Sequence, residues 1–203
     1  MNKYKVVLVG ELNAGKTTLA RYMCFNDFLD STVSTVGAAY SHIKYDKNTS
    51  VELWDTSGQE KFANLTSLYY KNATIILLVF DCDNSRFENK LKFYLEEISN
   101  KVKEDNDYKI IIVCNKIDLV EKSNLNYLKK KINEIVDNSL SKDKVSYYIE
   151  ISCKNKIGRE TLIEKIIYFA QELQEKKSSY AITYNIDNYV NLEDTNQEKK
   201  CCY

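Results

Sequence analysis

The sequence contains no proline, only five glycines and a single histidine among its 203 residues. This scarcity leaves no Pro/Gly-rich linker. One histidine excludes chemistry that needs several, including that of most zinc hydrolases. Lys plus Arg and Asp plus Glu both number 29, so the net charge is zero. A generic DNA-binding protein usually carries a basic excess, and we therefore expect no nucleic-acid partner.

Long hydrophobic runs are also missing. The first run, Val6 to Gly10, is too short for a secretory signal. The run from Ile75 to Phe80 is too short to cross a bilayer. The six cysteines show no Cys-x-x-Cys spacing, which indicates free thiols in a reducing compartment. We expect a cytoplasmic protein unless something attaches it to a membrane.

Short apolar runs alternate with segments of helical periodicity. We predict strands at residues 3–9, 38–45, 50–55, 74–80, 109–114 and 145–151, and helices at 16–25, 87–102, 125–135 and 162–173. Strands that alternate with helices are typical of βαβ units. The fold class is therefore predicted to be α/β, with a six-stranded, mostly parallel sheet, one antiparallel edge strand, and helices on both faces.

The apolar periodicity ends before the C-terminus. Residues 1–175 are predicted to form one folded domain. Residues 176–203 carry balanced charges and scattered apolar residues without a period. We expect this segment to be a flexible tail.

Residues 10–17, GELNAGKT, have the spacing G-x-x-x-x-G-K-T directly after a predicted strand and at the start of a helix. This context is the one that a phosphate-binding loop requires. The loop amides and the helix N-terminus would face phosphate anions. Lys16 would reach the terminal phosphates, and the Thr17 hydroxyl would bind magnesium. The alternative is an ordinary strand-to-helix turn.

A second motif, Asp55-Thr56-Ser57-Gly58-Gln59, follows the strand at 50–55. Asp55 could hold magnesium through a water molecule. Gly58 could bring its backbone N–H close to a γ-phosphate because it has no side chain. Gln59 is placed to orient an attacking water. On its own this pattern is also typical of a turn.

A third motif, Asn115-Lys116-Ile117-Asp118, closes the strand at 109–114. The Asp118 carboxylate could accept two hydrogen bonds from guanine, whereas adenine would leave it unpaired. Asn115 could hold the loops together, and the Lys116 stem could cover the base. A polar turn is the alternative, but the carboxyl edge of a parallel sheet is where ligands bind.

In order and spacing, the three motifs resemble those of the Ras superfamily of small GTPases, over about residues 3–175. The resemblance implies GTP and GDP as ligands with Mg²⁺, slow hydrolysis, and Gln59 as the catalytic residue. It implies Thr17, Thr35 and, through water, Asp55 as the residues that hold the metal. The nucleotide-contacting residues that it implies are Leu12, Asn13, Ala14, Gly15, Lys16, Thr17, Thr18, Phe28, Ser34, Thr35, Gly58, Asn115, Lys116, Asp118, Ser152, Cys153 and Lys154.

Further segments resemble the Rab family. They are Trp54-Asp55-Thr56, the YYKNA sequence at 69–73 and the LVFD sequence at 78–81. The sequence GAAY at 37–40 is similar to that of the early-endosomal Rabs. In Rabs an aromatic triad is read by effectors, and the matching residues are Tyr40, Trp54 and Tyr69. The alternative is that all three are core aromatics.

The chain ends Cys201-Cys202-Tyr203, which resembles Rab tails that receive two geranylgeranyl groups. Two lipid chains are what stable anchoring requires. Incidental thiols on a mobile end are the alternative. The resemblance implies a monomer on the cytosolic face of endosomal or other vesicular membranes. It also implies effector proteins, an exchange factor, a GTPase-activating protein and a prenylation escort or GDI-type chaperone as partners.

Two residues depart from the family pattern. Leu12 stands where a small residue is usual and would crowd Gln59, and Ser57 replaces alanine beside Gln59. Leu12 favours a competing reading, a GTP-locked module that recruits effectors but hardly hydrolyses. A third reading is a P-loop phosphotransferase. Such enzymes usually close an arginine-bearing lid, and the three arginines here lie far from any lid insertion.

Overall fold

The computed structural model describes residues 1–29, 34–58, 68–83, 86–102 and 107–197. It divides into two compact units, residues 1–170 and residues 171–203. The first unit contains the whole sheet and the three motifs. The second begins within helix α5 (Arg159–Gln197). The predicted start of the tail at residue 176 also falls within this helix, and the flexibility of the tail stays a prediction.

Six strands form one sheet, as predicted. Its order is β2-β3-β1-β4-β5-β6. Only the pair formed by the edge strand β2 and its neighbour β3 is antiparallel, and the other four pairs are parallel. The strands are β1 (Asn2–Val9), β2 (Ala38–Lys44), β3 (Thr49–Thr56), β4 (Ile75–Asp81), β5 (Lys109–Asn115) and β6 (Val145–Glu150).

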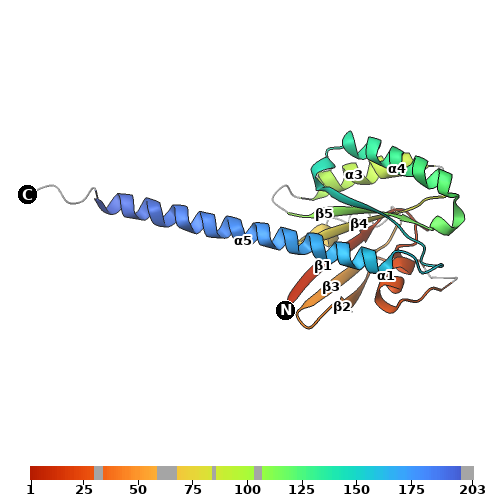
Figure 1. The fold of residues 1–203 in the computed structure, drawn as a ribbon, viewed down its shortest axis with the longest axis horizontal. Coiled ribbons are helices and arrows are strands. Elements are labelled where there is room, and N and C mark those ends of the chain that lie inside the picture. The colour runs from red at the N-terminus through yellow and green to blue at the C-terminus, as the bar shows by residue number, and fades with distance from the viewer. Residues whose placement is uncertain (30–33, 59–67, 84–85, 103–106, 198–203) are drawn as a thin grey trace, which may run out of the picture. The chain divides into compact units, whose positions relative to one another are not determined.

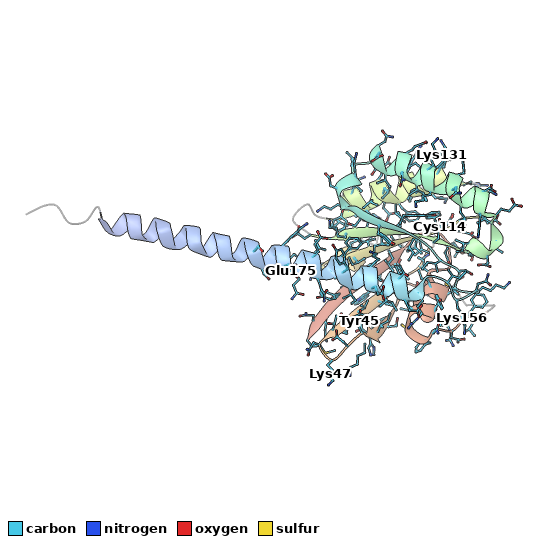
Figure 2. All side chains as sticks on the ribbon, in the orientation of Figure 1. Tyr45, Lys47, Cys114, Lys131, Lys156 and Glu175 are labelled. Carbon is cyan, nitrogen blue, oxygen red and sulfur yellow. The ribbon has the colours of Figure 1, made fainter. Side chains whose placement is uncertain are left out.

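Helices cover both faces of the sheet, which explains why the central strands are apolar throughout. Helix α1 (Lys16–Phe25) and the first turns of α5 lie on one face, and α3 (Phe87–Lys101) and α4 (Lys122–Asp137) lie on the other (Figure 1). Within β4, Leu77 packs toward α1 and α5, and Leu78 packs toward α3 and α4. The side chains in Figure 2 show Cys114 inside this core and Lys47 on the turn between β2 and β3.

The predicted helix ends were less accurate than the predicted strands. Helix α4 begins at Lys122, three residues before the predicted start at 125. Its first turn is polar and contributes nothing to the apolar stripe from which the helix was predicted. Two short 3₁₀ helices, Ile117–Leu119 and Lys142–Lys144, complete the described elements. None of the helices that the structure describes is both long and apolar enough to cross a bilayer.

The parallel strands place their carboxyl ends at one edge of the sheet. The phosphate-loop motif follows β1, the Asp55 motif closes β3, the Asn115 motif closes β5, and the loop at 152–154 follows β6. Segments more than 100 residues apart in the chain are thereby brought to the same edge. This is the edge at which open α/β sheets bind ligands.

Candidate functional site

The loop between β1 and α1 wraps around the ammonium group of Lys16. Lys16 Nζ donates hydrogen bonds to the carbonyl oxygens of Gly10 (2.9 Å) and Glu11 (2.8 Å). The side chain is buried, and this burial lowers the pKa of Lys16 to about 8, against the opposing effects of Asp55 and Glu11. Gly15 precedes the helix with a φ of 87°, a conformation that glycine adopts without strain. The loop therefore presents a buried cation and the N-terminus of α1 to the same space.

Three oxygen-bearing side chains meet beside this cation. The Thr17 hydroxyl donates to Asp55 Oδ2 at 2.7 Å, and the Thr35 hydroxyl donates to the same oxygen at 3.1 Å. The two hydroxyl oxygens are 2.8 Å apart. Burial raises the pKa of Asp55, while both hydroxyls and Lys16 act in the opposite direction.

This oxygen cluster fits a hard divalent cation. Magnesium prefers oxygen ligands and usually binds through one or two carboxylates together with substrate phosphates. The second carboxylate oxygen of Asp55, Oδ1, is buried and has no hydrogen-bond partner among the described residues. An unsatisfied buried carboxylate oxygen is costly unless a ligand occupies the site. Thr17, Thr35 and Asp55 are thus the residues that would hold Mg²⁺.

Gly58 closes the site from the other side. A Cβ atom built on it would lie 2.6 Å from Lys16 Nζ and 2.6 Å from the backbone nitrogen of Leu12. The backbone at Gly58 therefore approaches the phosphate loop more closely than any side chain would allow. The predicted role of its N–H, facing a terminal phosphate, stays a prediction.

At the other end of the site, Asn115 joins two loops. Its side-chain amide donates to the carbonyl oxygen of Ala14 at 2.9 Å, and the thiol of Cys153 lies 3.7 Å from its Oδ1. Asp118 accepts a hydrogen bond from the Ser152 hydroxyl through Oδ1. Ser152 in turn accepts one from the backbone N–H of Asn155 at 3.0 Å. The carboxylate is thus held from behind by the loop that follows β6.

These groups surround a cavity of about 630 Å³. Fifteen of the seventeen predicted nucleotide-contacting residues line it. They are Leu12, Asn13, Gly15, Lys16, Thr17, Thr18, Phe28, Ser34, Thr35, Gly58, Asn115, Lys116, Asp118, Cys153 and Lys154. The other two, Ala14 and Ser152, are buried behind the wall and hold Asn115 and Asp118. Asp55 is also buried, beneath Thr17 and Thr35.

The cavity includes side chains that the motifs did not indicate. Leu29 and Leu119 line it, and so do Thr56 and Ser57, which stand inside the Asp55 motif but were assigned no contact with a nucleotide. Thr56 and Leu119 directly follow Asp55 and Asp118, so adjacency to a motif residue is the signal that could have found them. Leu29 follows Phe28 in the same way. No residue-type signal distinguishes any of the three.

The three predicted effector-binding aromatics form one cluster. The Tyr40 and Trp54 ring centroids are 5.6 Å apart in an edge-to-face arrangement, and those of Trp54 and Tyr69 are 6.2 Å apart. Tyr40 is 55% exposed, and the other two are half-buried against the core. The alternative that all three are core residues is therefore wrong for Tyr40. Lys5 lies over the Trp54 ring, 4.7 Å from its centroid.

Some predicted residues fall outside the described part of the chain. They are the catalytic candidate Gln59 and the lipidation candidates Cys201 and Cys202. Their roles stay predictions.

Comparison with known proteins places this chain among small GTPases. The sequence model of the Ras family matches residues 5–172. Ras-related protein Rab-5B of Plasmodium falciparum is 33% identical over 168 residues, covering 81% of this chain and 76% of the relative. GTP-binding protein YPT53 of Saccharomyces cerevisiae is 32% identical over 201 residues, covering 96% and 90%. Ras-related protein Rab-32D of Dictyostelium discoideum is 31% identical over 182 residues, covering 86% and 76%.

Proposed function

Since the chain belongs to the Rab family of Ras-like small GTPases and is a GTP hydrolase, we propose that it binds GTP and GDP with Mg²⁺ and works as a membrane-anchored switch. One observation carries this proposal. A buried cation at Lys16, the hydroxyls of Thr17 and Thr35, and a carboxylate suited to guanine at Asp118 all border one cavity. Asp55, buried directly behind the two hydroxyls, completes the oxygen cluster that fits Mg²⁺. The proposal assigns the phosphates to Lys16 and the oxygen cluster, and the base to Asp118.

Each end of the cavity has its own chemistry. Lys16 and the N-terminus of α1 stabilise negative charge on the phosphates. A bound magnesium ion would supply further positive charge to the phosphate oxygens. Gln59 orients the attacking water. No arginine is available in cis from the segment 26–40, and an arginine supplied to the transition state contributes about 10³–10⁵ in rate. Intrinsic hydrolysis is therefore slow and depends on an activating protein.

The switch follows from the position of Thr35 and Gly58. Both border the phosphate end, and each belongs to a segment that continues toward the aromatic cluster of Tyr40, Trp54 and Tyr69. In the GTP-bound protein the γ-phosphate would order Thr35 and Gly58. The aromatic cluster would therefore be arranged differently from the way it is in the GDP-bound protein. We assign the cluster to effector binding because Tyr40 is exposed while its neighbours are anchored in the core.

The membrane attachment is assigned to two lipids on Cys201 and Cys202. The GAAY sequence at 37–40, similar to that of early-endosomal Rabs, favours endosomal membranes. The partners proposed are effectors, an exchange factor, an activating protein and a prenylation escort or GDI-type chaperone. Because Leu12 lines the cavity beside Gly58, a form that hydrolyses little and remains GTP-bound is the second candidate.

A membrane-recovery experiment tests the anchored switch. The prenylated protein is incubated with vesicles, which are then recovered by flotation. Wild type should float with the vesicles, and the double variant Cys201→Ser with Cys202→Ser should remain in the soluble fraction. Cys24→Ser is the matched control, because it removes a half-buried thiol far from the C-terminus in sequence. Recovery of the double variant equal to wild type would show that another anchor operates.

A further inference from the structure

Arg159, the first residue of α5, bonds to the far end of α1. Its Nε donates to the carbonyl oxygens of Tyr22 (2.9 Å) and Met23 (3.1 Å), and its Nη2 donates to that of Met23 (2.6 Å). The arginine side chain is 20% exposed. The chain has only three arginines, so the planar, multi-donor guanidinium is rare in this molecule.

The carbonyl groups that Arg159 contacts belong to the last turn of α1. Carbonyls there have no intrahelical partner and carry the negative end of the helix dipole. Helix α1 has no basic residue of its own in its last turn. Asn26 bonds to the Tyr22 carbonyl through its backbone N–H at 2.9 Å, which leaves the Met23 carbonyl to Arg159. A cation from another element therefore completes the end of this helix.

Both partners of this contact lead directly to the wall of the nucleotide cavity. On one side, four residues separate Met23 from Phe28 and Leu29, which both line the cavity. On the other side, Arg159 follows the loop that begins at Ser152 and contains Cys153 and Lys154, which also line it. Lys156, labelled in Figure 2, lies in this loop. Arg159 lies 137 positions after Tyr22 and 136 after Met23 in sequence, so this contact joins two distant parts of the chain.

The loop before Arg159 is a closed unit. The backbone N–H of Ile157 donates to the Ser152 carbonyl oxygen at 2.9 Å, and the N–H of Ser152 donates back to Ile157 at 3.3 Å. Gly158 follows with a φ of 88°. A displacement of Arg159 would therefore be passed to Ser152, whose hydroxyl holds Asp118.

A second arginine acts at the same end of α1 but more weakly. Arg21 Nη2 lies 2.6 Å from Asp27 Oδ2, in the turn that leads to Phe28. The two side chains are 40% and 45% exposed, and exposed ion pairs of this kind contribute little. Arg159 is more buried and makes three charge-assisted hydrogen bonds, each stronger than a neutral one. Arg159 thus joins the 152–158 loop to the end of α1, whereas the Arg21–Asp27 pair lies wholly on the α1 side.

We propose that Arg159 is a positioning residue that sets how long the nucleotide stays bound, by holding the 152–158 loop against the α1 end. The inference rests on the proposed guanine-nucleotide site. Arg159 is absent from the cavity lining and far in sequence from Thr17, Thr35 and Gly58, which border the phosphate end. Its loss should therefore loosen the base end, raise the dissociation rate of GDP and of GTP by the same factor, and leave the bond-breaking step unchanged.

The test uses the full chain loaded with an N-methylanthraniloyl derivative of GDP, which is displaced by excess GDP. Arg159→Gln should raise the dissociation rate constant about tenfold, the equivalent of roughly one charge-assisted hydrogen bond. Arg159→Lys keeps the positive charge but loses the multi-donor guanidinium group. Its dissociation rate constant should lie between those of wild type and Arg159→Gln. Glu160→Gln is the control. It removes only the exposed partner 3.2 Å from Arg159 Nη1 and should change the rate by less than about twofold.

Single-turnover GTP hydrolysis is measured on the same proteins. It should stay within about twofold of wild type, because a positioning role at the base leaves the phosphate chemistry unchanged. The inference is overturned if Arg159→Gln and Arg159→Lys release GDP at the wild-type rate. It is also overturned if hydrolysis falls in step with the faster release, since that marks general loosening. Failure of wild type to retain any guanine nucleotide would instead refute the proposed function, and the inference with it.

Discussion

The Asn115 side-chain amide donates a hydrogen bond to the backbone carbonyl oxygen of Ala14 across 101 residues of sequence, at 2.9 Å. Asn115 is 2% exposed and Ala14 is fully buried. This contact ties the loop assigned to the base to the loop assigned to the phosphates. A Cβ atom at the neighbouring Gly15 would lie 2.4 Å from Asn115 Nδ2, so the two loops touch with no space for a larger residue.

Asn115→Asp should disturb this junction with almost no change of shape. The new carboxylate oxygen would face the Ala14 carbonyl, replacing a hydrogen bond with repulsion inside the protein. Leaving a buried acceptor unpaired costs about 1–3 kcal/mol. We expect about tenfold or greater loss of GDP affinity, measured by calorimetric titration. The control is Cys153→Ala, which removes the thiol near Asn115 Oδ1 but keeps the hydrogen bond from the Asn115 amide to the Ala14 carbonyl oxygen. Loss of affinity in the control but not in Asn115→Asp would contradict this role.

The magnesium assignment predicts a difference between GTP and GDP. Thr17→Asn replaces the hydroxyl that bonds to Asp55 with a larger amide in a crowded position. Because a bound Mg²⁺ would contact the terminal phosphates, triphosphate affinity should fall more than diphosphate affinity, by about tenfold or more at millimolar Mg²⁺. Thr35→Ser keeps its hydroxyl and should retain most of the affinity. Unchanged GTP affinity in Thr17→Asn would count against the site.

Leu12 should slow activated hydrolysis. It is 46% exposed and lines the cavity, and its backbone nitrogen is one of three atoms that lie 2.6 Å from the Cβ position of Gly58. Leu12→Gly should raise the rate stimulated by a Rab activating protein, and Gln59→Leu should abolish what remains. The measurement is phosphate release in a single turnover. If wild type already responds fully and Leu12→Gly adds nothing, the loop accommodates leucine without obstruction.

The strands and the positions of the motifs could be predicted because their signals are local. Buried parallel strands such as β4 and β5 are continuous apolar runs, and each motif directly follows a strand. The contacts of Arg159 could not be predicted in this way. They join a side chain at the start of α5 to carbonyl groups of α1, and any arginine in that segment would have the same local sequence signal. Their identification depends on how the elements pack.

In the predicted site, too, residues with a local sequence signal could be predicted, and contacts between distant segments could not. Lys16 and Asp118 were indicated by motifs whose spacing reflects one turn or loop. The resemblance implied Ser152 as a nucleotide contact, but its hydroxyl bonds to Asp118 instead, a contact that sequence could not reveal because the two residues are 34 positions apart. Leu29 and Leu119 were missed because an apolar residue beside a motif has no chemical signature of its own.

We propose that Asp118 makes this cavity specific for guanine. Its carboxylate lines the cavity, and Ser152 holds it in place. Asp118→Asn should weaken guanine binding about tenfold to 100-fold, because a charged hydrogen bond is lost. It should also favour xanthine nucleotides, whose O2 accepts a bond from an amide. Ser152→Ala keeps the carboxylate and should retain the preference for guanine.

The most direct measurement is calorimetric titration of the nucleotide-free protein and of Asp118→Asn with GDP, ADP and xanthosine diphosphate. Wild type should bind GDP at least about 100-fold more tightly than ADP, and the variant should prefer xanthosine diphosphate. Equal affinity of wild type for GDP and ADP, or GDP affinity unchanged in Asp118→Asn, would contradict the account.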